Sequence, residues 1–178
     1  DNTFQNQFYF IYYQINMMIF VILINLIQIL SNNKNIFIIV SVNKITLKIK
    51  GKGYKNIFGN YTGVVFKANY YPNEIHINTK NKSVLNYSYY FDKENNTVEL
   101  IWNRKIESCH NMFLRCNAIY EIDLSNFDSS IVESIQSMFN RCTSLISINF
   151  ANFQTGKVKS MYKTFYNCFS LISLNLSS

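Results

Sequence analysis

Glycine, proline and histidine are scarce in this chain, which has five glycines, one proline and two histidines among 178 residues. No glycine-rich, zinc-knuckle or aromatic RNA-binding signature is present. The four cysteines form no C-x-x-C motif and the histidines form no pair, so the sequence does not indicate a zinc site. Hydrophobic residues make up 48% of the chain, enough for a core and too many for a disordered protein. We therefore expect a folded protein without a metal, a cofactor or a nucleic-acid partner.

Acidic residues are nearly absent from one stretch of the chain. Residues 32–82 carry nine lysines and a single acid, Glu74, whereas basic and acidic residues balance between 83 and 178. The lysines are densest between Lys44 and Lys55. A basic strand of this kind can contact nucleic acid or anionic lipid, but a solvated strand face is the simpler interpretation.

Residues 8–30 contain no charged side chain and are almost wholly apolar. Their length is enough to cross a bilayer as a helix. The stretch after Met18 also has the length of a signal-peptide core that ends near Ser31, although no basic residues precede it and no A-x-A pattern follows. We expect residues 1–31 to be a signal peptide or a transmembrane anchor. A cleaved signal would export the remainder, whereas the positive-inside rule would keep the lysine-rich side of a retained anchor in the cytoplasm.

Short strands dominate the predictions for the next segment. Apolar and polar residues alternate strictly over residues 45–50, as in a strand with one wet face. Further candidate strands are residues 64–66, 74–77, 84–91 and 98–102. No helical periodicity lies between them, which favours antiparallel pairing. We expect residues 32–102 to form a small antiparallel β module that caps the segment that follows.

A 26-residue unit repeats through residues 103–178. Pairing residues 106–152 with the residues 26 positions later gives 18 identities in 47 pairs. The repeated positions that we assign to the core are Phe113, Cys116, Phe139, Cys142, Phe165 and Cys168. A fixed period of this size predicts stacked copies of one supersecondary unit. We therefore expect an α/β repeat solenoid of about three leucine-rich-repeat-like units, preceded by the β module and an N-terminal hydrophobic helix.

The repeat resembles that of the BspA-like leucine-rich-repeat surface proteins, whose unit runs M-F-x-x-C-x-S-L-x-x-L-N-L-S-N-F-D-T-S-x-V. Residues 138–158 follow this pattern, with departures that include Phe150 and Ala151 in place of Leu and Ser. In the next unit, Thr164 replaces Met. The resemblance covers residues 103–178 and implies a cell-surface or secreted solenoid used for adhesion or protein contacts. It implies no catalytic residue.

The cysteines allow two further interpretations. Cys116, Cys142 and Cys168 are equivalent positions, which favours reduced core cysteines over disulfides, although the spacing of neighbouring coils would permit a bridge. Cys109 and His110 could act as a nucleophile and a base. Neighbours on an extended segment point to opposite faces, however, and no third group is evident. We expect no enzyme.

The strand in each unit should present two outward columns of side chains. The candidate binding face comprises Glu121, Ser147 and Ser173 in one column and Asp123, Asn149 and Asn175 in the other. Small polar groups in columns suit a protein or glycan ligand, and a merely solvated sheet would look the same.

These observations favour a non-enzymatic scaffold for adhesion or protein interaction at the cell surface or in secreted form. Membrane contact would run through residues 8–30 if they are not cleaved. The alternative is a membrane-anchored sensor or assembly subunit whose basic segment lies at the cytoplasmic leaflet. The array reaches Ser178 without a polar closing unit, so we expect the natural chain to continue.

Overall fold

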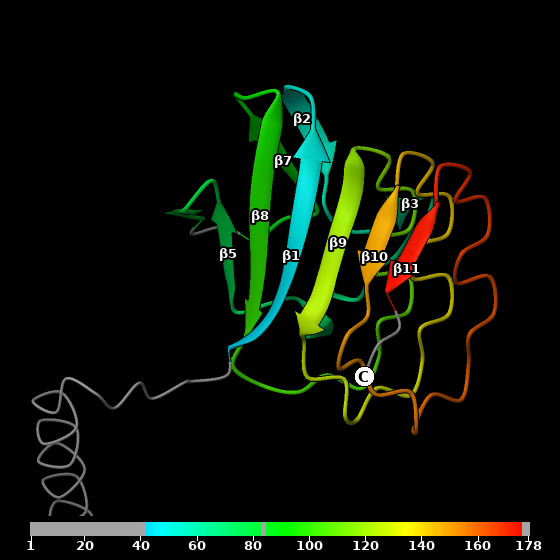
Figure 1. Ribbon diagram of the computed structural model, residues 1–178. Coiled ribbons are helices and arrows are strands. Elements are labelled where there is room, and N and C mark those ends of the chain that lie inside the picture. The colour runs from blue at the N-terminus through cyan, green and yellow to red at the C-terminus, as the bar shows by residue number, and fades with distance from the viewer. Residues whose placement is uncertain (1–41, 83–84, 176–178) are drawn as a thin grey trace, which may run out of the picture. The chain divides into compact units, whose positions relative to one another are not determined.

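The computed structural model describes residues 42–82 and 85–175, which belong to one compact unit (Figure 1). Most of the ordered elements are short strands, because alternating apolar and polar residues recur along the chain. The elements are β1 (Asn43–Lys50), β2 (Gly53–Asn56), β3 (Asn60–Tyr61), β4 (Val64–Val65), η1 (Ala68–Tyr70), β5 (Glu74–Ile77), β6 (Lys80–Asn81), β7 (Ser88–Phe91), β8 (Asn95–Trp102), β9 (Ile119–Asn126), β10 (Ser147–Asn149) and β11 (Ser173–Asn175).

A seven-stranded mixed sheet, in the order β11-β10-β9-β1-β8-β5-β6, organises this unit (Figure 1). Strand β1 is central and pairs antiparallel with both β8 and β9. Strands β9, β10 and β11 come from successive repeats and pair in parallel. Two small antiparallel ribbons, β2–β7 and β3–β4, complete the β structure. The sheet therefore runs without interruption from the lysine-rich segment into the repeats.

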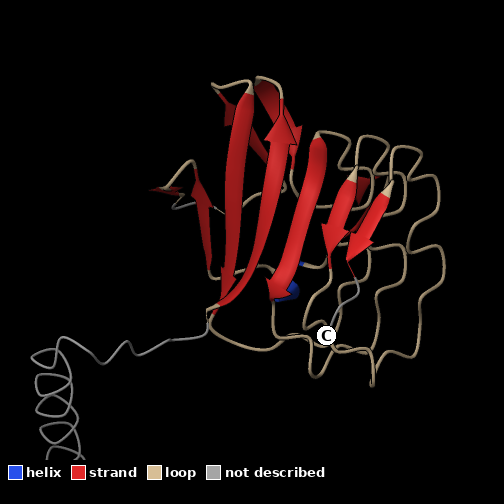
Figure 2. Cartoon of the chain, viewed as in Figure 1, coloured by secondary structure: helices blue, strands red, loops and turns tan. Residues whose placement is uncertain are grey.

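The prediction of an α/β repeat solenoid is wrong. The part of the chain that the structure describes contains no α-helix, only the short 3-10 helix η1, and it is a mostly β fold (Figure 2). The repeats do not form a separate solenoid, because β9 pairs with β1 and continues the sheet of the preceding segment. The predicted N-terminal helix and membrane segment lie outside the described residues. Within the described ranges, no helix is long and apolar enough to cross a bilayer.

Backbone hydrogen bonds explain why the segments that contain the repeated Phe and Cys are not helical. In an α-helix each N–H bonds to the carbonyl four residues earlier. Here the Asn111 N–H donates to the Gln136 carbonyl in the next repeat, over 3.1 Å. The Phe113 N–H likewise donates to the Met138 carbonyl, over 2.9 Å. Asn111 and Arg115 also have φ values of 61° and 60°, a left-handed conformation incompatible with a right-handed helix. These segments are loops stacked on one another.

Equivalent phenylalanines of successive repeats lie over one another in the core. The ring centroids of Phe113 and Phe139 are 5.9 Å apart, and those of Phe139 and Phe165 are 5.6 Å apart, with both pairs stacked. Phe113 and Phe139 are fully buried, and Phe165 is partly buried against the same core. Each repeat therefore buries its apolar side chains largely against its neighbours.

The repeated cysteines form a second column in this core, and all four cysteines are free. Cys116 and Cys142 are fully buried and Cys168 is partly buried. The Cys142 thiol lies 2.9 Å from the Phe113 carbonyl oxygen, and the Cys168 thiol lies 3.0 Å from that of Phe139, so each donates to the preceding repeat. Burial raises the pKa of all three thiols. A cysteine at this position fills a small apolar space and links two repeats.

Candidate binding face of the sheet

The six predicted surface residues lie together on the outer face of β9, β10 and β11. In the first column, Ser147 is paired in register with Glu121 on one side and Ser173 on the other. In the second column, the paired residues are Asp123, Asn149 and Asn175. The alternate residues of these strands point inward, and Ile122 and Ile148 are buried in the core. The two columns arise because a parallel in-register sheet places equivalent side chains next to one another.

The second column is a hydrogen-bonded ladder. The Asn149 side-chain amide donates to Asp123 Oδ1 over 3.0 Å, and the Asn175 amide donates to Asn149 Oδ1 over 3.0 Å. Each acceptor also holds its own strand end, because the Ser125 N–H donates to Asp123 Oδ1 and the Ala151 N–H donates to Asn149 Oδ1. Amide ladders of this type stabilise stacked strands. This column therefore links the repeats, and its polar groups are largely engaged within the protein.

The side chains of the first column differ from those of the second column in their contacts. Among the described residues, no hydrogen bond or ion pair engages the side chains of Glu121, Ser147 or Ser173. Glu121 and Ser173 are exposed, and Ser147 is half-buried. These three side chains can consequently bond to a ligand without first breaking a hydrogen bond or ion pair inside the protein.

Strand β1 extends the face beyond the predicted residues. Lys48 is the antiparallel partner of Glu121, and Thr46 is the partner of Asp123. Both residues line the same shallow depression, of about 510 Å³, as the two columns. The Lys48 ammonium donates to the Thr97 hydroxyl over 3.0 Å, which holds it at the surface. The alternation at residues 45–50 marks Thr46 and Lys48 as outward-facing, but no sequence signal indicates their pairing with the first repeat.

Charged side chains continue across the sheet on β8 and β5. Lys44 forms an ion pair with Glu99 at 2.7 Å, with both side chains partly exposed. His76 Nε2 lies 3.1 Å from Glu74 Oε2, and His76 Nδ1 lies 3.8 Å from Glu99 Oε2. Lys44 and Glu99 neutralise each other and His76 contacts both carboxylates, so the charged groups at β5 and β8 bond to one another, whereas the first column at the repeats has no such partner among the described residues.

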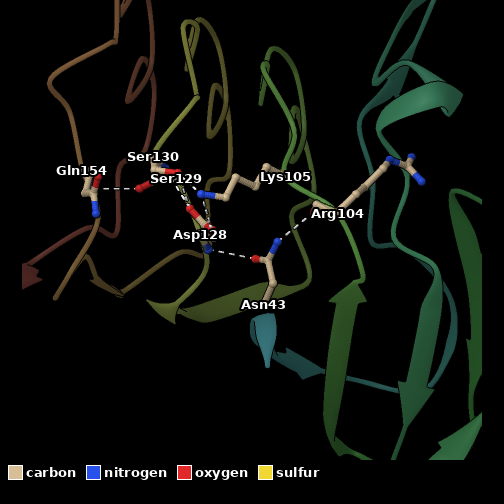
Figure 3. Close-up of polar contacts among 7 residues, drawn as sticks. All are labelled: Asn43, Arg104, Lys105, Asp128, Ser129, Ser130 and Gln154. Atoms are coloured by element: carbon tan, nitrogen blue, oxygen red, sulfur yellow. Dashed lines mark hydrogen bonds and ion pairs between the residues drawn. The ribbon is translucent and has the colours of Figure 1, made fainter. Parts of the chain in front are cut away.

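A separate polar cluster ties the start of β1 to the turn after β9 (Figure 3). Asn43 accepts the Asp128 N–H over 2.8 Å and donates to the Arg104 carbonyl over 2.9 Å. Lys105 forms an ion pair with Asp128 at 3.1 Å. The Ser130 hydroxyl donates to the Asp128 carboxylate over 2.6 Å, and this bond is the main reason that the pKa of Asp128 is lowered. The cluster fixes the junction of the two segments, and we assign it a structural role.

The Cys109–His110 pair has no geometry for nucleophilic chemistry. Cys109 is fully buried, and burial raises the pKa of its thiol well above the usual range. The side chain of His110 is exposed, and partial desolvation, followed by the nearby Lys67, lowers its pKa. A buried neutral thiol and an exposed imidazole cannot act together on one substrate as nucleophile and base. No cluster of three metal-ligating side chains occurs within the described ranges.

The fold and this face define a mostly β repeat protein whose sheet presents polar columns to solvent. Comparison with protein families gives a match over residues 64–177 to the family described as "Mycoplasma protein of unknown function, DUF285". The match spans more than half of the chain, and the protein belongs to this family. It does not establish the narrower membership among BspA-like leucine-rich-repeat proteins. Neither the curated proteins nor the solved structures gave a match.

Proposed function

We propose that this protein is a non-enzymatic interaction module at the cell surface, and that the outer sheet face at β9–β11 binds a protein or a glycan. The observation that carries the proposal is the first column, in which Glu121, Ser147 and Ser173 are accessible and have no side-chain partner among the described residues. The ladder beside it holds the strands rigidly, so a ligand meets a preorganised surface.

The repeat sequence supports the same function. Residues 138–158 are similar to the repeat of the BspA-like surface proteins, a resemblance that implies adhesion or protein contacts. Membership of the DUF285 family is compatible with this function and specifies no reaction. An apolar segment at residues 8–30 would deliver the module to the membrane or across it.

A single charge reversal on the face tests the proposal. The full chain is screened against an array of purified soluble glycans and extracellular matrix proteins, and its affinity for each bound member is then measured. Glu121→Arg should weaken binding about tenfold or more, because it reverses the charge of the one acid in the first column. The matched control is Glu107→Arg, which makes the same charge change at an exposed site outside the depression. Equal losses in the two variants would contradict the assignment of the face.

The location is tested separately on intact cells. Protease added outside should cleave the region that follows residue 43 if the module faces the exterior. Full protection in intact cells, with cleavage after lysis, would contradict a surface role and would favour an intracellular, membrane-anchored subunit.

A further inference from the structure

A second concave site lies at the end of the sheet where β1 finishes and β9 begins, the upper end in Figure 1. It is an open cleft of about 880 Å³. Three cationic side chains line it, Lys50, Lys55 and Arg115, and none of its lining residues is acidic. The six residues of the two polar columns lie outside this cleft, so it is distinct from the sheet face.

The three cations of the cleft have no carboxylate partner. Three lysines outside the cleft are ion-paired, Lys44 with Glu99, Lys105 with Asp128 and Lys159 with Glu133. Among the described residues no ion pair involves Lys50, Lys55 or Arg115. A concave surface lined by one sign of charge concentrates its field and attracts ligands of the opposite sign.

Arg115 lines this cleft and also a second hollow, which Tyr61 lines too. Its guanidinium lies over the Tyr61 ring, 3.7 Å from the ring centroid, which orients the side chain. Its Nη1 atom is buried and has no hydrogen-bond partner among the described residues. A buried charged donor without a partner is costly, and an anionic acceptor reaching it would remove that cost.

The remainder of the lining is suited to sugars. Tyr54 is an exposed residue, with 77% of its surface accessible, and its ring packs edge-on against Tyr90 with centroids 5.4 Å apart. Such a ring has an apolar face that can cover the C–H face of a sugar. Amides and hydroxyls supply hydrogen-bonding groups around it, from Asn56, Asn95, Asn117, Ser144 and Ser170.

We propose that this cleft binds an anionic oligosaccharide, a short sugar chain that carries sulfate or carboxylate groups. Lys50, Lys55 and Arg115 bind the anionic groups, Tyr54 packs against a sugar ring, and the amides and hydroxyls bond to sugar hydroxyls. A nucleic acid is a poorer fit, because three cations around one hollow do not form a track along a phosphate backbone. A membrane surface is also a poorer fit, because the charges line a concavity rather than a flat or projecting patch.

Binding of a heparin-derived hexasaccharide to the full chain tests the proposal. The wild type should bind this probe and should bind its desulfated counterpart at least about tenfold more weakly. Lys50→Gln combined with Lys55→Gln should reduce affinity about tenfold or more, because two of the three cations are lost. The matched control combines Lys80→Gln with Lys82→Gln, which removes the same charge from one exposed and one half-buried lysine outside the cleft. Circular dichroism of each variant checks that the fold is retained.

Further variants and probes distinguish recognition of the sugar from simple attraction between opposite charges. Tyr54→Ala should weaken hexasaccharide binding several-fold without changing net charge, which simple ion attraction would not produce. Equal losses in the two lysine pairs would overturn the proposal. So would tighter binding of single-stranded DNA or of phosphatidylglycerol vesicles than of the hexasaccharide. Glu121→Arg should leave hexasaccharide binding within about threefold of wild type. The proposal for the cleft can therefore be refuted without refuting the proposal for the sheet face.

Discussion

Replacing Phe139 with alanine should destabilise the protein more than any other Phe→Ala change in the repeats. The side chain is fully buried, and its ring is stacked between Phe113 and Phe165 at centroid distances of 5.9 and 5.6 Å. Truncating a core phenylalanine costs about 3–5 kcal/mol. Phe139 also makes an edge-on pair with Phe150 at 6.0 Å, and the loss of three ring pairs, each contributing about 0.5–1.5 kcal/mol, places the expected value near the upper end of that range.

The matched control for this substitution is Phe169→Ala. Phe169 lies in the third repeat and is 76% exposed, so its truncation should change the free energy of unfolding by no more than about 0.5 kcal/mol. Urea titration followed by circular dichroism measures both variants. With a slope of about 2 kcal/mol per M, Phe139→Ala should lower the midpoint by roughly 2 M. Midpoints of the two variants within about 0.5 M of each other would refute the shared core.

Three other outcomes follow from the contacts. Asn149→Ala should cost about 1–3 kcal/mol in urea titration because it breaks the ladder in the middle, whereas Ser147→Ala should cost less than about 0.5 kcal/mol. The pKa of Asp128 is lowered in the folded state. Its contribution to the free energy of unfolding is therefore fully present above the unfolded-state pKa of about 3.9 and is lost as pH falls through the folded-state pKa. Asp128→Asn should therefore flatten the fall of the urea midpoint below about pH 4, and an unchanged acid profile would contradict the assignment. In the native state at pH 8, a thiol reagent should modify the partly buried Cys168 well before Cys142, and simultaneous modification would contradict the burial.

Part of this architecture could be predicted from the sequence. The alternation at residues 45–50 gave the outward residues of β1, and the 26-residue period gave the register of β9, β10 and β11. Both signals work because they are local periodicities that reflect which side chains face a core. The positions of the two polar columns follow from that register alone.

The features that were missed depend on contacts between distant segments. An α/β solenoid was expected from the 26-residue period and the leucine-rich-repeat resemblance, but the segments that contain the repeated Phe and Cys are loops, in which Asn111 and Arg115 adopt a left-handed conformation. The pairing of Lys48 with Glu121 joins segments far apart in the chain, and no local pattern encodes it. The cationic cleft likewise combines Lys50 with Arg115 from the first repeat. Lysine density alone gave no indication that these side chains border a hollow.

Directed disulfide formation between β1 and β9 tests most directly the claim that one sheet continues from the lysine-rich segment into the repeats. Lys48 and Glu121 are partners across the antiparallel pair, where Cα atoms lie about 4.5–5.5 Å apart, within reach of a disulfide. In the full chain carrying Lys48→Cys and Glu121→Cys, mild oxidation and peptide mapping should identify this bridge in high yield. The pair Lys48→Cys with Ser147→Cys, separated by two strand spacings or about 10 Å, should not bridge. Equal yields from the two pairs, or no bridge in the first, would contradict a continuous sheet.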